Sequence, residues 1–156
     1  MTAPAIRNPE ARSLQGNRAG IVSRVIADGI DYCIVFAIYL GILIGLGIAE
    51  YLLTGSKLEI PVPPVGVTIA VPWLILVGYL TAGWGGTGRT FGKTVMGLRV
   101  VTRNGLRLPP RRAFFRAILC ATLPWVILWV VISRKNLGIH DIVFRSSVVY
   151  DWDAGV

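Results

Sequence analysis

The feature that most constrains the fold is a long apolar run from Ile30 to Leu53. At a rise of ~1.5 Å per residue, a helix of this run is about 36 Å long, which is enough to cross the hydrocarbon core of a bilayer. A second run, Val65 to Trp84, has about the right length for one further crossing. Pro72 lies inside this run and predicts a kink, which neighbouring helices can tolerate in a membrane. The two runs predict two transmembrane helices and argue against a soluble globule.

A third apolar run, Ala117 to Ser133, allows two interpretations. It has about seventeen residues, the lower limit for a crossing, and Pro124 lies in its middle. Its length favours a crossing, whereas Arg116 at one end and Arg134-Lys135 at the other favour a re-entrant segment with both ends inside. The expected fold class is an all-α polytopic membrane protein with two clear transmembrane helices and a third short, Pro-broken membrane segment. The side that holds the C-terminus stays open.

The charges orient this arrangement. Sixteen Lys and Arg stand against eight Asp and Glu, for a net charge of +8. The segment 85–116 contains no acid but eight basic residues, namely Arg89, Lys93, Arg99, Arg103, Arg107, Arg111, Arg112 and Arg116. By the positive-inside rule this segment is cytoplasmic and the nearly neutral loop 54–64 is outside. The N-terminus, with Arg7, Arg12 and Arg18, is then also cytoplasmic.

The basic loop needs an acidic partner. It is tied between two apolar runs and lacks interleaved aromatic residues, so a bilayer with anionic headgroups fits it better than nucleic acid does. The residues expected to contact headgroups or another anion are Arg89, Lys93, Arg99, Arg112 and Arg116.

Within the same loop, Asn104-Gly105 separates two short β-prone stretches, 95–101 and 106–108. Asn-Gly in such a position predicts a small cytoplasmic β-hairpin. The N-terminal residues have no apolar stretch of the kind that signal peptides carry. The expected organisation is a polar tail over 1–19, a membrane domain over 20–150 with spans at about 30–53, 65–84 and 117–133, and a short tail over 151–156.

Three charged residues at the start of the first helix are the main candidate site. Helical spacing places Arg24, Asp28 and Asp31 along one face, where their net charge of one negative could attract a cation or hold a proton. Ionisable residues near a membrane centre cost on the order of 2.5–3.5 kcal/mol each and are functional suspects. The alternative is structural pairing: a helix starting near Arg24 keeps all three within about 10 Å of the cytoplasmic surface. There the aspartates would complement the helix N-terminus, and Arg24 could reach lipid headgroups.

Three blocks of residues follow one another along the chain in a recognisable order. They are Arg24-Val-Ile-Ala27 followed by Ile30-Asp31, then Gly88–Val101 followed by Arg112 and Arg116, then Ser133–Asp141 followed by Ser147–Tyr150. Together they resemble the RDD family of small bacterial membrane proteins, from about Ala19 to Tyr150. The resemblance implies Arg24, Asp31 and Asp141 as signature residues, with Asp28 an additional acid. It also implies a short strand near the C-terminus, a bacterial cell membrane location and, as a suggested role, transport of unidentified ligands.

Other motifs point to packing and not to chemistry. Gly92-Lys93-Thr94 does not fit a phosphate-binding loop, because that loop needs a glycine where Thr87 stands. His140-Asp141 could relay protons, but pairing of Asp141 with an arginine such as Arg116 or Arg145 is favoured. Cys33 and Cys120 lie inside apolar runs and are expected to pack as small hydrophobic side chains. No catalytic residue, metal site or cofactor is expected, and neither is enzymatic activity.

Two functions remain. The first is a non-catalytic accessory or assembly subunit of a larger bacterial membrane complex, because two or three spans hardly enclose a translocation pathway. Gly41 and Gly45 form a GxxxG spacing that permits close helix approach to other subunits or to a second copy. The alternative is an oligomeric transporter that handles a cation or proton through Arg24, Asp28 and Asp31.

Overall fold

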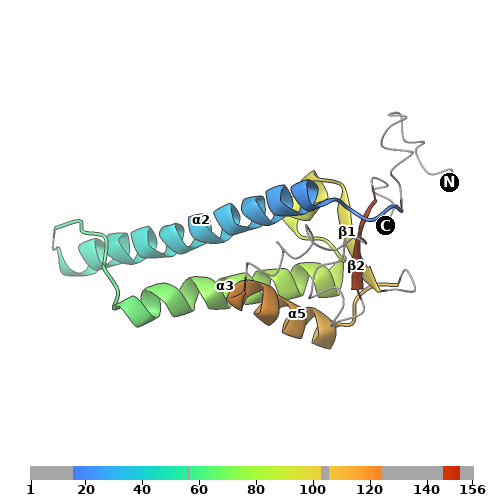
Figure 1. The fold of residues 1–156 in the computed structure, drawn as a ribbon. Coiled ribbons are helices and arrows are strands. Elements are labelled where there is room, and N and C mark those ends of the chain that lie inside the picture. Colours follow the sequence, from blue (N-terminus) through green and yellow to red (C-terminus); the bar gives the residue numbers. More distant parts are fainter. Residues whose placement is uncertain (1–15, 56, 103–105, 124–145, 152–156) are drawn as a thin grey trace, which may run out of the picture.

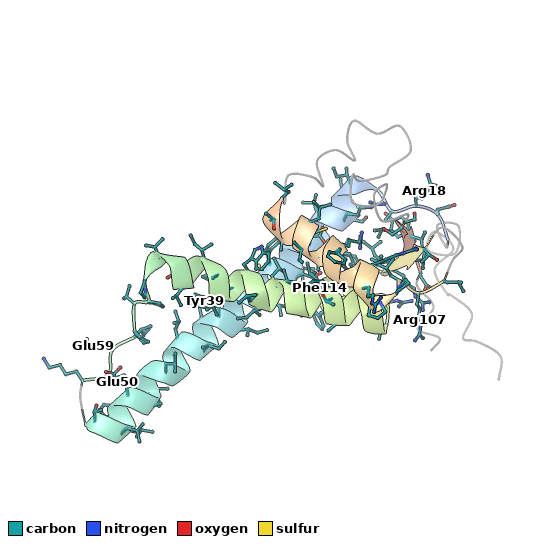
Figure 2. The ribbon with its side chains drawn as sticks, turned by 90° about the horizontal axis from the view of Figure 1, so that it is seen from below. Arg18, Tyr39, Glu50, Glu59, Arg107 and Phe114 are labelled. Atoms are coloured by element: carbon teal, nitrogen blue, oxygen red, sulfur yellow. The ribbon has the colours of Figure 1, made fainter. Side chains whose placement is uncertain are left out.

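Two long helices dominate the molecule. The computed structural model describes residues 16–55, 57–102, 106–123 and 146–151. Helix α2 covers Ile21–Thr54 and helix α3 covers Val65–Gly86, and the two run in opposite directions (Figure 1). Seen from below they cross and then separate toward the connection between them (Figure 2). Both helices are long and apolar enough to cross a membrane, as the sequence predicts.

The helix ends follow from local sequence. Gly55 ends α2 in the left-handed conformation, with φ 65°, and donates its N–H to the carbonyl of Tyr51 at 3.0 Å. Helix α3 begins after Pro64 and continues through Pro72. Helix α2 begins at Ile21, before the apolar run itself, so the helix already includes all three charged residues of the candidate site.

The remaining elements gather at one end of the helix pair, which we call the sheet end (Figure 1). Helix α4 (Phe91–Val95) follows α3 after a short turn and leads into strand β1 (Leu98–Thr102). Strand β2 (Ser146–Tyr150) pairs with β1 in an antiparallel register that sets Val100 opposite Val148. The chain just before α2 lies along β2, where the N–H of Ala19 donates to the carbonyl of Val148 at 2.9 Å.

The predicted local hairpin is confirmed only as a short contact, because the main partner of β1 is another strand. Strand β1 pairs over five residues with β2, whereas the 106–108 stretch contributes only one isolated bridge, between Val101 and Arg107. The reason is Pro109, which has no N–H for a strand ladder and precedes the first turn of the next helix. The strand that the family resemblance implied near Ser147–Tyr150 is present as β2.

Helix α5 (Pro110–Thr122) begins before the third apolar run and covers its first residues. It packs antiparallel on α3: Pro110 lies against Gly85, and Trp73 donates its indole N–H to the Thr122 hydroxyl at 3.3 Å. Residues 124–133 of the expected third span lie outside the described residues. The core at the sheet end is built from Ala19, Leu80, Trp84, Leu98, Val100, Leu108, Ala113, Ala117 and Val148.

A buried charge network as the candidate functional site

The charged residues of α2 share one face, as their spacing predicts. Arg24 and Asp31 are each only 1% exposed, and they belong to a buried stripe that also contains Ala27 and Val35. Asp28 lies next to this stripe and is half-buried. The stripe faces α3 and α4, so the charges point into the protein at its sheet end.

Asp31 is the centre of the network. Its carboxylate accepts a hydrogen bond from the Tyr79 hydroxyl on α3 at 2.8 Å and another from the Gly92 backbone N–H on α4 at 2.8 Å. The Thr90 hydroxyl, at the N-cap of α4, donates a third. One buried carboxylate therefore joins three helices, and several hydrogen bonds to its charged form compensate for its loss of hydration.

Helix α4 lies unusually close to α2. A Cβ atom on Gly92 would collide with the backbone carbonyl oxygen of Ala27, so only glycine fits at this contact. Tyr79 supports the same helix, because its hydroxyl accepts the N–H of Phe91 at 3.0 Å. Sequence reasoning did not identify Tyr79, Thr90 or Gly92 as site residues. A tyrosine inside an apolar run was the one available signal, since a buried hydroxyl needs a partner.

Lys93 completes the network and corrects one expectation. Its side chain is 3% exposed, pairs with Asp28 and lies 3.9 Å from Asp31. Its ammonium also lies 5.1 Å from the centre of the Trp84 ring. The assignment of Lys93 to lipid headgroups was wrong, because two carboxylates and an aromatic ring draw the side chain inward.

Arg116 was also expected at the headgroups, and it too is buried. Its guanidinium lies 4.3 Å from the centre of the Trp84 ring, on the face of α5 that packs against α3. Arg89 and Arg99 both bind Asp151, at 2.7 and 3.1 Å, and thereby hold the residue that follows β2. Arg112 is exposed on α5.

Arg24 faces the sheet. Its guanidinium donates to the carbonyl of Val148 in β2 at 3.4 Å, and one residue away the hydroxyl of Ser23 bonds that of Tyr150 at 2.8 Å. The suggestion that Arg24 reaches lipid headgroups is therefore wrong in this structure. Asp141 and His140 lie outside the described residues, and so does the suggested pairing of Asp141 with an arginine.

Comparison with protein families gives one match. The model of the RDD family covers residues 18–145, which include the whole charge network from Arg24 to Lys93 as well as Asp141. The chain belongs to the RDD family. No curated protein and no solved structure matches the chain. Within this RDD-family chain, Arg24 and Asp31 contact different neighbours: the Arg24 guanidinium donates to β2, and the Asp31 carboxylate accepts from α4.

A cavity of about 240 Å³ lies beside the network, between α2, α3 and α5. Charged side chains form one part of its wall, namely Arg24, Asp28, Asp31, Lys93 and Arg116. The rest is mainly apolar and includes Leu76, Leu80 and Cys120. Asp28 keeps 30% of its side-chain surface exposed, and so remains accessible although it pairs with Lys93. Among the residues that the structure describes, no three metal-ligating side chains lie together.

Proposed function

We propose that this RDD-family chain is a non-catalytic, multi-pass protein of the bacterial inner membrane that serves as an accessory or assembly subunit of a larger membrane complex. The observation that carries the proposal is the contrast between its two ends. At the sheet end, the charges bind one another and hold α4 and β2 in place. Toward the other end, α2 and α3 present apolar side chains with no cover in the described part of the chain.

Those uncovered surfaces are large. Only 17% of the most apolar window of each long helix is buried. Lipid covers such surfaces in a membrane, and partner helices can do so where small residues allow close approach. Gly41 and Gly45 meet this condition, because a Cβ on either would touch none of the described residues within 4 Å. The pair therefore has no packing role inside the described fold and supports an interface with another helix.

The sheet supports two crossings with both ends of the domain on the same side. Strand β2 pairs with β1 and also with residues 16–19, so all three lie at the sheet end. Helix α5 leaves this end along α3, and the chain must return to it by Ser146. We therefore favour a re-entrant third segment over a crossing, with the sheet end cytoplasmic because the exposed arginines of 107–112 lie there.

Site-directed labelling tests this topology. In a background with Cys33 and Cys120 replaced by alanine, we expect Lys57→Cys to react with a membrane-impermeant maleimide on intact spheroplasts. Asn17→Cys, and a cysteine-containing tag added after Val156, are expected to react with the same maleimide only after the membrane has been permeabilised. Reaction of the C-terminal tag on intact spheroplasts would instead establish a third crossing.

Subunit association is tested with the two uncovered glycines. We expect the purified protein to retain partner subunits in fixed ratio in mild detergent, and Gly41→Ile combined with Gly45→Ile to reduce their recovery at least ten-fold, the ratio that ~1.4 kcal/mol produces. The same substitutions should leave the thermal midpoint of the isolated chain nearly unchanged, because their side chains have room. Gly78→Ile on α3, where a Cβ also meets nothing, is the matched control. Equal recovery from all variants would contradict a role for these glycines.

The cavity favours a second candidate, an oligomeric transporter of a cation or proton. Asp28 borders this cavity and is partly accessible, so it could exchange Lys93 for a transported cation. A clean homo-oligomer whose proton flux in vesicles is lost in Asp28→Asn would favour this function over the subunit role.

A further inference from the structure

Helix α5 presents a second charged surface, which the network does not use. Arg111 and Arg112 in its first turn are exposed, and so is Arg107 just before it. Within the described ranges, no acidic side chain pairs with any of the three. The segment 85–116 itself contains no acid. These positive charges therefore face outward without a neutralising neighbour in the described fold.

Aromatic side chains lie beside these arginines. Phe114 is 44% exposed and Phe115 is 58% exposed, and their rings pack edge to face with 5.6 Å between centroids. Residues three and four positions apart are neighbours on a helix, so both rings adjoin Arg111, and Phe115 also adjoins Arg112. The opposite face of α5 is buried on α3 through Ala113 and Ala117. Figure 2 shows Phe114 and Arg107 along this helix and at its beginning.

The direction of α5 determines how deep its arginines and phenylalanines lie relative to a bilayer that α3 crosses. The helix starts beside Gly85 at the sheet end and runs back along α3 toward Trp73. If α3 crosses the bilayer, Arg111 and Arg112 lie at the headgroup level, and the two phenylalanines lie about one turn, or ~5 Å, deeper. Aromatic rings below a band of basic residues match the boundary between headgroups and acyl chains in an anionic leaflet.

We propose that Arg107, Arg111, Arg112, Phe114 and Phe115 form a binding surface for anionic phospholipid, which we call the α5 collar. The arginines bind the lipid phosphates, and the rings contact the upper acyl chains. The α5 collar rests on the proposed membrane insertion, and it places headgroup binding on the exposed face of α5 and on Arg107 before it, instead of on the buried side chains of Lys93 and Arg116. An acidic protein segment is the competing occupant, but it would not account for the exposed rings at the deeper level.

Tryptophan quenching by brominated lipids tests the collar in a background with Trp125, Trp129 and Trp152 replaced by phenylalanine, because the remaining Trp73 and Trp84 lie on α3, against which α5 packs. We expect the full chain in phosphatidylcholine bilayers to bind brominated phosphatidylglycerol in preference to brominated phosphatidylcholine. Arg111→Gln and Arg112→Gln should each weaken this preference about five-fold, the effect of one basic residue near an anionic surface. Lys57→Gln, which removes one charge at the other end of α2, should leave it unchanged. Inorganic phosphate at equal ionic strength should not displace the lipid.

The outcomes separate this inference from the proposed membrane insertion. Extraction of the wild-type chain from membranes by alkaline carbonate would contradict the insertion itself. Retention in membranes with equal lipid preference in Arg111→Gln, Arg112→Gln and Lys57→Gln would overturn only the α5 collar. If Arg111→Gln released an acidic protein and left the lipid preference unchanged, the α5 collar would be overturned. An acidic protein segment would then be the occupant of this surface. Among the described residues, the side chains of Arg111 and Arg112 make no ion pair, so unchanged thermal midpoints are expected to verify that their variants fold.

Discussion

Replacing Asp31 with alanine is expected to lower the free energy of unfolding by about 3–5 kcal/mol, the range for removal of one partner from a buried ionic network. The variant loses the acceptor of the Tyr79 hydroxyl and of the Gly92 N–H, and the Thr90 hydroxyl loses its partner as well. A buried donor without an acceptor keeps its full cost of dehydration. Thermal unfolding of the purified protein in detergent, followed by circular dichroism, measures the effect.

Asp28→Ala is the matched control for this prediction. Asp28 lies one turn away on the same helix, pairs with Lys93 alone among the described contacts, and keeps part of its surface exposed. Its loss should cost less than half as much as the loss of Asp31. Equal losses of stability in the two variants would contradict the central position assigned to Asp31. A loss only in Asp28→Ala would assign the central position to Asp28 instead.

Gly92→Ala is the second variant with a large expected effect. The added methyl group would overlap the Ala27 carbonyl, which belongs to a helix backbone and has no side-chain freedom to move away. Overpacking costs typically ~1–3 kcal/mol, and a backbone collision lies at the upper end of this range. Helix α4 must then separate from α2, and its bond from the Gly92 N–H to Asp31 is lost. Hydrogen exchange over 88–97 should accelerate, and the thermal midpoint should fall.

Gly29→Ala on α2 is the control, and its expected effect on the free energy of unfolding is opposite to that of Gly92→Ala. A Cβ at Gly29 meets nothing within 4 Å, so the methyl group has space. Alanine inside a helix is more favourable than glycine by roughly 0.5–1 kcal/mol, so this variant should be as stable as the wild type or slightly more stable. Destabilisation of both glycine variants to the same extent would show that the close contact between α4 and α2 is not responsible.

The parts of the fold that depend on local pattern could be predicted from the sequence. The two long helices follow from apolar runs of sufficient length, and the shared face of Arg24, Asp28 and Asp31 follows from helical periodicity. The residues that contact these three charged side chains could not be predicted in the same way. A basic loop beside a membrane suggests headgroup contacts for every arginine and lysine in it, and nothing local distinguishes buried Lys93 from exposed Arg112. That difference arises only when α4 packs on α2.

The partner strand of β1 could not be predicted from local sequence either. Asn104-Gly105 favours a local hairpin, but the choice between two partner strands depends on how well each can be buried and paired. Strand β2 brings Val148 into the core opposite Val100, and 106–108 is cut short by Pro109. Leu108 is buried as well, so the pairing of β1 with β2 over five residues is what outweighs the short loop of a local hairpin.

The position of β2 determines the order in which this protein can mature. Arg24 emerges from the ribosome early, but the Val148 carbonyl to which it donates is synthesised more than a hundred residues later. Both long helices are synthesised before then, while the bonds between residues 16–19 and β2 cannot yet form. Every nascent chain thus passes through a period in which both long helices have been synthesised and the bond from Arg24 to β2 has not yet formed. The fold is therefore completed only after β2 has been synthesised, and a chain truncated before Ser146 is expected to lack the pairing of β1 and of residues 16–19 with β2.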